Sequence, residues 1–548
     1  MKTIHKILLI NPPFEDFYQT HQRQIPLGLK YLQASLEKAG YETSLLDCLA
    51  ENHQRIIPFP EDLNYLQQYY LPNDLSPFKL FTHYRHFGIQ SNEIANKIKK
   101  AQPDLIGISI NFTPYWETAI EIARLCKSLC PRVPIVAGGH HATVAPESIL
   151  GSKIIDFVVL GEGEKRLLQL IKILAARDLD QLAKMEGIAF ISLDEIKINQ
   201  PQNAIQNLDD LPWPKSDGAI AMILTSRGCP KQCNFCSVAN VMGKKIRFRT
   251  IASVIAEMEA CWHNGITKFD FEDDNLTFDR QRALQLFTEI TKRFAGKNLI
   301  LSAQNGLMAD SLDEELIRVM KVAGFEWLNV PLVSSSQQVQ KKILRYQSQE
   351  QFLKIIDWAE KYELKVIAYL ILGLPEEAID HVLEDILFLT GLPVIIGPSL
   401  FYPPPGSVTY QNCVRNKFIT GVDFVHYRST AMAVQTNNFS RRDIITLFRL
   451  VRLVNYLKRK PAWIENILFQ ARPITSTQAN SLIFDHKLNQ EEIGKLIIDE
   501  LAQHKNFWGL SLKKRSNDSY HYQWIDYHCS QYLVNKFFEK LAKIEICN

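Results

Sequence analysis

The chain has 548 residues, of which 46% are hydrophobic and 22% are charged, and its formal net charge is +3. This length exceeds the size at which a single hydrophobic core stops growing, so two or three domains are expected. The composition is that of a globular protein and excludes a disordered or fibrous chain. The small net charge and the lack of long Lys/Arg runs indicate that nucleic acid is not a partner.

No segment reaches the roughly 18 apolar residues that a membrane span needs, and the apolar run near the start is too short for a signal peptide. The sequence therefore predicts a cytoplasmic protein without a membrane span. Ten cysteines in so long a chain do not make a disulfide scaffold. In a reducing compartment, a tight group of cysteines indicates metal binding or catalysis.

Short apolar runs typical of buried strands alternate with helical patterns in the first part of the chain. The runs are residues 6–10, 41–46, 105–110, 135–137 and 157–160. Strands that alternate with helices predict a doubly wound parallel sheet, and thus an α/β fold. The aromatic stretch at residues 52–86 has no pattern that assigns it to either kind of element.

A proline-rich stretch at residues 208–215 interrupts this pattern and is predicted to be a linker. Strand and helix patterns then alternate again, which predicts a complete or partial β/α barrel. After residues 403–406 (PPPG) the pattern becomes helical, and residues 443–457 are strongly amphipathic. The predicted domains are an N-terminal sheet domain, a barrel and a helical C-terminal region, with boundaries at 1–205, 206–420 and 421–548.

Three cysteines, Cys229, Cys233 and Cys236, lie within one short segment directly after a strand-like run. Three thiolates can bind three irons of a 4Fe–4S cluster and leave the fourth iron open to a cosubstrate. Structural zinc is the alternative, but it normally has four ligands, and Cys261 and His263 match no familiar zinc-finger spacing. The sequence therefore favours an iron–sulfur cluster.

The spacing Cys-x3-Cys-x2-Cys at the end of a first barrel strand resembles the signature of the radical S-adenosylmethionine superfamily. The resemblance implies that the open iron chelates the amine and carboxylate of S-adenosylmethionine, and that an electron from the cluster yields a 5′-deoxyadenosyl radical. Phe235 matches the aromatic residue that the family usually has before the last cysteine. A reducing electron donor such as flavodoxin or ferredoxin is the implied partner.

A second motif, residues 271–277 (FEDDNLT), resembles the turn where the family binds the ammonium group of the cosubstrate. The resemblance assigns Asp273, Asp274 and Asn275 to S-adenosylmethionine, and an anionic turn suits a cation. The alternative is an acidic loop that caps the next helix.

Two later turns extend the resemblance to about residue 410. Gly373 begins a turn that resembles the family's adenine-side turn, and residues 403–407 resemble its closing loop. Val333 stands where relatives often have a glutamate. At this strand the serines at 334–336 are the alternative source of polar contacts to ribose or substrate.

Roughly residues 5 to 200 resemble the cobalamin-binding domain that is fused to many radical enzymes. The motifs that carry this resemblance are Asn11-Pro12-Pro13, Pro26-x-Gly28, Ser109-Ile110-Asn111, Gly138-Gly139-His140 and Gly161-Glu162-Gly163-Glu164. The resemblance places the nucleotide tail of cobalamin beside Ser109, Gly138, Gly139 and His140. Paired glycines at a strand end let a bulky ligand approach the backbone, although a tight strand–helix turn is the alternative.

The histidine motif that supplies a lower ligand to cobalt in other cobalamin proteins is absent after the first strand. We therefore expect base-off cobalamin without a protein imidazole. Glu162 and Glu164 permit acid–base catalysis, but a structural turn that faces the barrel is favoured. Cys126 and Cys130 are predicted to pack in a core. The sequence assigns no catalytic residue.

The two resemblances together imply a cobalamin-dependent radical methyltransferase. In this scheme one S-adenosylmethionine methylates cob(I)alamin, and a second yields the radical that abstracts hydrogen from an unactivated carbon of a small molecule. The first alternative is oxidative cyclisation without methyl transfer, as in anaerobic magnesium-protoporphyrin ester cyclase. A cobalamin or cluster sensor is less favoured because no recognition helix is evident.

Overall fold

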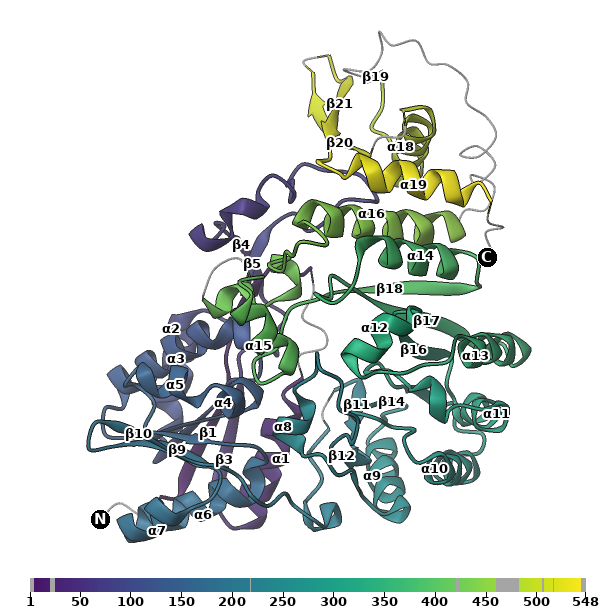
Figure 1. The fold of residues 1–548 in the computed structure, drawn as a ribbon. Coiled ribbons are helices and arrows are strands. Elements are labelled where there is room, and N and C mark those ends of the chain that lie inside the picture. The colour runs from purple at the N-terminus through teal and green to yellow at the C-terminus, as the bar shows by residue number, and fades with distance from the viewer. Residues whose placement is uncertain are drawn as a thin grey trace.

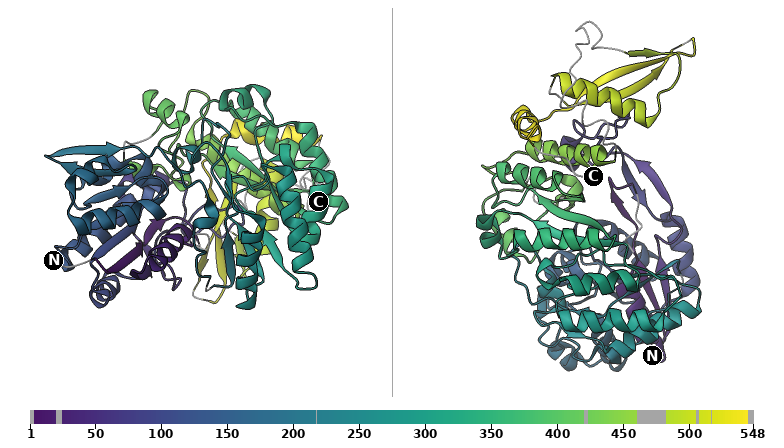
Figure 2. Two further views of the ribbon diagram at one scale, coloured as in Figure 1. Left: turned by 90° about the horizontal axis from the view of Figure 1, so that it is seen from below. Right: turned by 90° about the vertical axis from the view of Figure 1, so that its right-hand side faces the viewer.

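The computed structural model describes residues 4–19, 25–216, 218–419, 423–459, 482–504, 507–515 and 517–543. An N-terminal α/β unit lies beside a barrel-like unit, and the C-terminal segments stack on the far edge of the barrel (Figure 1). Seen from below, the first two units stand side by side (Figure 2). The α/β fold class predicted from the sequence is confirmed.

The N-terminal sheet has seven strands in the order β10-β9-β8-β7-β6-β1-β3. Their bounds are β1 (Lys6–Asn11), β3 (Glu42–Asp47), β6 (Leu105–Ser109), β7 (Ile135–Gly138), β8 (Phe157–Val159), β9 (Ile188–Ser192) and β10 (Glu195–Asn199). The five strands from β3 to β8 run parallel, and β9 and β10 add an antiparallel edge.

Helices cover both faces of this sheet. Helices α1 (Leu27–Lys38) and α6 (Gly163–Ala176) share one buried cluster, while α2 (Ser91–Ala101), α3 (Trp116–Leu129) and α5 (Pro146–Gly151) share the other. The sheet is therefore doubly wound, as predicted. The direction in which strands are added reverses between β1 and β6, and ligands of such sheets bind at the carboxyl edge near this reversal.

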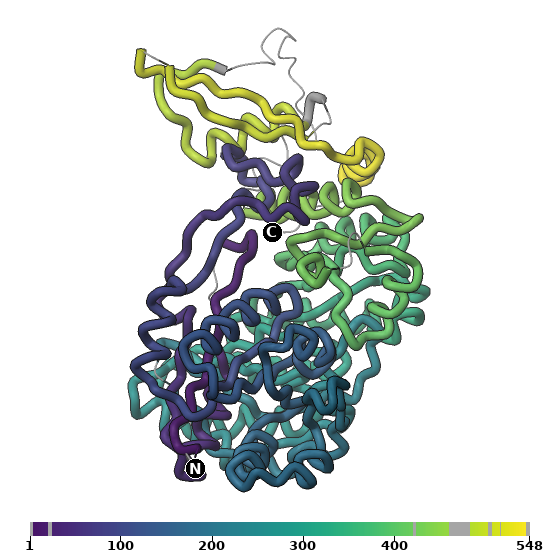
Figure 3. Tube along the Cα trace, turned by 90° about the vertical axis from the view of Figure 1, so that its left-hand side faces the viewer, coloured from purple at the N-terminus to yellow at the C-terminus, as the bar shows by residue number. Residues whose placement is uncertain are grey.

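Residues 52–86, which the sequence left unassigned, form part of a small antiparallel sheet. This sheet contains β2 (Phe14–Asp16), β4 (Gln54–Ile57) and β5 (Tyr84–Phe87), and a short 3-10 helix, η1 (Glu61–Leu66), follows β4. The segment runs up to the C-terminal region (Figure 3), where Leu75 N donates to Leu510 O at 2.8 Å. Its aromatic residues fill a core shared with distant parts of the chain.

The second unit is a partial β/α barrel, as predicted. Its parallel strands are β11 (Ile220–Ile223), β14 (Lys268–Phe271), β15 (Ile300–Ser302), β16 (Trp327–Val333), β17 (Lys365–Leu372) and β18 (Val394–Leu400). The intervening helices are α9 (Ile251–His263), α10 (Arg280–Arg293), α11 (Glu314–Ala323), α13 (Gln349–Lys361) and α14 (Ile379–Thr390). A bridge between Leu301 and Phe325 links its two three-stranded halves.

The C-terminal region is not purely helical, so this part of the sequence prediction is wrong. It contains α16 (Arg441–Lys458), α18 (Gln490–His504) and α19 (Gln531–Leu541), together with an antiparallel sheet of β19 (Leu482–Phe484), β20 (Trp508–Lys514) and β21 (Tyr520–Asp526). The strands are short, and the strong helical period of α16 dominates the sequence pattern there. In the described ranges, every helix falls short of what a membrane crossing requires. The predicted domain boundaries stay predictions.

Candidate active site between two domains

The cysteine-rich loop connects β12 (Ser226–Arg227) with α8 (Val238–Met242) at the carboxyl end of the first barrel strand. Asn234 anchors it from both sides: its N donates to Ile343 O at 3.0 Å, its Nδ2 donates to Lys342 O at 2.7 Å, and its O accepts from Thr409 N at 3.0 Å. Lys342 and Ile343 belong to α12 (Gln337–Ile343), and Thr409 belongs to α15 (Val408–Arg415). The loop is thus held by later barrel segments.

The three predicted ligands are accessible on this loop. Cys229 and Cys233 are half-buried and Cys236 is exposed, whereas Cys261 is buried on α9. Phe235 packs against the barrel core. The residues fit an iron–sulfur cluster, because three reachable thiols share one anchored loop and a buried polar atom nearby, Asn275 Oδ1, has no partner among the described residues.

The two aspartates of the acidic turn after β14 have different environments. Both oxygens of Asp273 are engaged: Oδ2 accepts from Thr225 N at 3.0 Å, and Oδ1 accepts from the hydroxyls of Thr225 (2.8 Å) and Ser226. Asp274 is half-buried and accepts only a 3.3 Å bond from Gly228 N among the described residues. Burial raises the pKa of Asp274 to about 6, and Asp273 adds to this rise. Of the two aspartates, Asp274 is therefore the one with hydrogen-bonding capacity left for the predicted cosubstrate contact.

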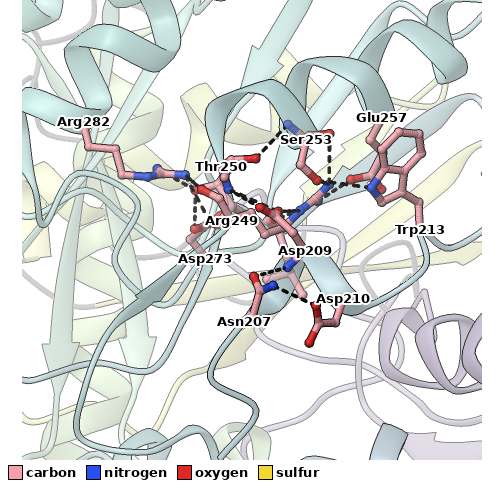
Figure 4. Close-up of polar contacts among 12 residues, drawn as sticks. Asn207, Asp209, Asp210, Trp213, Arg249, Thr250, Ser253, Glu257, Asp273 and Arg282 are labelled. Carbon is pink, nitrogen blue, oxygen red and sulfur yellow. Dashed lines mark hydrogen bonds and ion pairs between the residues drawn. The ribbon is translucent and has the colours of Figure 1, made fainter.

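Asp273 belongs to a structural network that reaches back to the interdomain linker. Figure 4 shows the guanidinium of Arg282 reaching toward Asp273 and Arg249, and Asp209 of the linker close to Thr250. Arg282 Nη2 donates to Arg249 O at 2.9 Å, and Thr250 N donates to Asp209 Oδ2 at 3.0 Å. The acidic turn is held in place by this network, which joins β11, α9 and α10.

The residues predicted to hold cobalamin gather at the carboxyl edge of the first sheet. Ser109 and Gly138 end adjacent strands and are register partners. A Cβ built on Gly138 would meet only Val159 O, at 3.7 Å, so the space beside it is open. Gly139 has φ +116°, and its Cβ would lie 2.5 Å from Asn111 Oδ1. Gly138 thus fits an approach of the cofactor, whereas Gly139 meets a backbone requirement.

The cobalamin-side loop touches the cluster-side loop directly. His140 Nε2 lies 2.8 Å from Ser237 Oγ, and Ser237 follows Cys236. Burial lowers the pKa of His140 to about 4, so its imidazole is neutral near pH 7. Asn240 Nδ2 of α8 donates to Gly406 O at 2.6 Å, which brings the PPPG loop to the same junction. The motifs of both units therefore meet at one interface.

Gly373 lies in the turn after β17, and Val333 ends β16. Gly373 follows β17 with φ +94°, and its Cβ would approach Ile444 of α16 at 3.3 Å. Val333 is buried and adopts φ +62°, a strained backbone for a β-branched residue. Ser334 Oγ donates to Glu377 Oε1 at 2.6 Å, so this hydroxyl is engaged within the protein.

Tyr402 is a residue that the sequence analysis assigns to no site. Its side chain is 39% accessible, yet burial raises its pKa, and the charges of Asp16 and Cys236 add to the rise. Tyr402 follows β18, and the two charges that act on it come from the N-terminal unit and from the cluster loop.

Comparisons with known proteins agree with this geometry. A model of the radical SAM superfamily matches residues 223–389, and a model of the B12 binding domain matches residues 82–171. The uncharacterized methyltransferase PH0819 of Pyrococcus horikoshii is 26% identical, over 83% of this chain and 94% of that protein. Cytidylyl-2-hydroxyethylphosphonate methyltransferase of Streptomyces wedmorensis is also 26% identical, over 68% and 73% of the two chains.

Among solved structures, the radical S-adenosylmethionine methyltransferase TsrM from Kitasatospora setae, with cobalamin and a [4Fe-4S] cluster bound, has a TM-score of 0.58. The two chains are 18% identical, and the match covers 76% of this chain and 75% of TsrM. This likeness shows the fold.

The fold and the site together define a radical enzyme in which a barrel faces a cobalamin-type sheet domain. The chain thus combines a B12 binding domain with a radical SAM domain, and it is similar to proteins named methyltransferases over most of its length. Its cofactors are a 4Fe–4S cluster, S-adenosylmethionine and cobalamin, and its substrate is a small molecule.

Proposed function

We propose that this enzyme transfers a methyl group from S-adenosylmethionine to a carbon atom of a small-molecule substrate. The observation that carries the proposal is the 2.8 Å contact between His140 of the cobalamin-side loop and Ser237 beside the cluster cysteines. A substrate in this junction is within reach of both cofactor sites. The two sequence relatives described above are both methyltransferases by name.

When bound, the cluster and cobalamin supply reductive cleavage of S-adenosylmethionine and a carrier for methyl. The chain's own residues bind these cofactors and orient them toward the substrate. The cluster cysteines hold the iron, and Asp274 accepts the cosubstrate ammonium with a charge-assisted hydrogen bond. The open backbone surface at Gly138 takes the cobalamin tail, and Tyr402 lines the substrate space. A protein of this kind orients its cofactors and excludes competing reactions. We propose flavodoxin or ferredoxin as the electron donor.

The test is anaerobic incubation of reconstituted protein with trideuteromethyl-labelled S-adenosylmethionine and a panel of candidate substrates. Methyl transfer adds one labelled methyl group to a product, which mass spectrometry detects. Cys229→Ala protein is the matched control. A product that loses hydrogen without gaining the label would replace methyl transfer by oxidative cyclisation.

A further inference from the structure

A buried ion-pair network joins the cobalamin-binding domain to the start of the cluster loop. Glu162 and Glu164 lie at the beginning of α6, whereas Arg227 in β12 and Arg247 in β13 (Arg247–Phe248) belong to the barrel unit. Arg227 Nη1 lies 3.1 Å from Glu162 Oε1, and its Nη2 lies 2.6 Å from Glu164 Oε1. Arg247 Nη1 lies 2.8 Å from Glu162 Oε2. The expected structural turn that faces the barrel is thus confirmed.

All four side chains are between 2% and 8% exposed. Two guanidinium groups face two carboxylates, so the network is neutral as a whole. Further hydrogen bonds fill its outer positions: Arg247 donates to Ile205 O and Met242 O, at 2.6 Å each, and the Arg227 guanidinium lies 5.1 Å from the centre of the Tyr31 ring. These ion pairs fix the relative orientation of the two domains as well as their separation, because a guanidinium binds carboxylates in a planar fork.

The network lies between the two cofactor loops. On the cobalamin side, Gly161 N donates to Thr143 Oγ1 at 2.9 Å, and Thr143 Oγ1 donates to Gly139 O at 2.8 Å. On the cluster side, Arg227 directly precedes Gly228, which has φ +90° and whose Cβ would lie 2.5 Å from Lys245 O. A continuous series of contacts therefore runs from the glycine pair after β7 to the first cluster cysteine.

We propose that Glu162 and Glu164, acting through Arg227 and Arg247, are positioning residues that fix the separation between bound cobalamin and the cluster. This inference rests on the proposed function, in which both cofactors serve one substrate. Stability alone does not account for the network, because apolar replacements of buried ion pairs are often neutral or stabilising. A radical transfer needs fixed geometry, since a misplacement of about 1 Å costs about a hundredfold in rate.

The test measures the distance between cob(II)alamin and the reduced cluster in the holoenzyme by pulsed electron paramagnetic resonance. Wild-type protein is expected to give one narrow distance. Glu162→Gln keeps the shape of the side chain but leaves the two arginines with less negative charge. We expect its mean distance to shift by about 1 Å or more, the scale on which oriented reactions lose rate, and its distribution to broaden.

Arg227→Lys is the second variant, because it keeps the buried charge and removes only the fork geometry. It gives the deciding result if Glu162→Gln does not fold. The control is Arg293→Lys, since Arg293 pairs with Glu259 on the barrel surface with 57% of its side chain exposed. The control should keep the wild-type distance.

A variant that melts at lower temperature but keeps the narrow wild-type distance would overturn the proposal and leave the network a purely stabilising role. The measurement uses no substrate. A wild-type protein with a sharp distance and no methyl transfer would therefore reject the proposed function without rejecting this inference.

Discussion

The two glycines at the end of β7 are required for different reasons. Gly138 borders an open space, whereas Gly139 has a backbone conformation that favours glycine, so we expect different results from substitutions at the two positions. Gly138 has an ordinary backbone, and an added side chain meets only Val159 O at 3.7 Å. Gly139 has φ +116°, and its Cβ would lie 2.8 Å from Ile110 O as well as close to Asn111. Gly138→Leu is thus the clean test of the cobalamin site, and Gly139→Ala tests the turn.

The expected magnitudes follow from these contacts. Gly139→Ala combines left-handed strain of roughly 1–2 kcal/mol with overpacking of roughly 1–3 kcal/mol. A loss of about 2–5 kcal/mol is a large share of the stability of a domain. Gly138→Leu should change the free energy of unfolding by only about 0.5 kcal/mol. Its side chain occupies the space expected for the nucleotide tail, so cobalamin affinity should fall at least about tenfold, or about 1.4 kcal/mol.

The assay combines thermal melting of the cofactor-free protein, iron content after reconstitution and absorbance titration with cobalamin. Gly151→Leu is the matched control, because a Cβ there meets nothing within 4 Å and Gly151 lies on α5 of the same domain. Wild-type cobalamin affinity in well-folded Gly138→Leu protein would refute the placement of the cofactor. Unchanged melting of Gly139→Ala would refute the backbone argument.

Alanine at any of the three cluster cysteines should abolish 5′-deoxyadenosine formation, because the iron site loses a ligand, whereas Cys126→Ala should retain it. Asp274→Asn should weaken S-adenosylmethionine binding by roughly ten- to a hundredfold in calorimetry, while Asp273→Asn should lower the melting temperature. His141 is buried and burial lowers its pKa to about 4. The unfolded chain therefore takes up the proton first, and stability present above about pH 6.5 falls by about 2 kcal/mol at pH 5, a loss that His141→Gln should remove. Cob(II)alamin in the protein should show no nitrogen superhyperfine splitting.

Specific outcomes would contradict each of these expectations. Reconstituted protein that holds zinc and no iron would reject the cluster. Equal cosubstrate binding by wild-type and Asp274→Asn protein would give that turn a structural role only. If His141→Gln protein lost as much unfolding free energy between pH 7 and pH 5 as the wild type, His141 would not be the source of the acid-dependent loss of stability. Nitrogen splitting would refute the ligation prediction.

The layers of both domains could be predicted because each β/α unit carries its pattern locally. Apolar strands such as 6–10 and 365–372 are bounded by loops and followed by helical periods. The cluster cysteines could be predicted for the same reason, since all three lie on one loop. Local spacing is enough wherever a site is built from neighbouring residues.

The different roles of Asp273 and Asp274 could not be predicted, because they depend on partners far away in sequence. Asp273 faces Thr225, which is 48 residues earlier, and only the fold shows that its oxygens are engaged there. Residues 52–86 are a similar case. Tyr70 is buried and its hydroxyl donates to Thr430 O, 360 residues later. No local period records such a contact.

The interdomain contacts also combine a local motif, which the sequence shows, with a distant partner, which only the fold shows. Glu162 sits inside the glycine-rich turn that carries part of the resemblance, and Arg227 sits two residues before the first cluster cysteine. Each lies beside a recognisable motif, but only their 3.1 Å contact shows why a charge is required there. An enzyme that joins two cofactors needs its loops fixed relative to each other as well as correctly formed. In this chain, the charged residues that adjoin cofactor motifs in both domains, Glu162 and Arg227, are therefore the positions that we expect to set the distance between the cofactors.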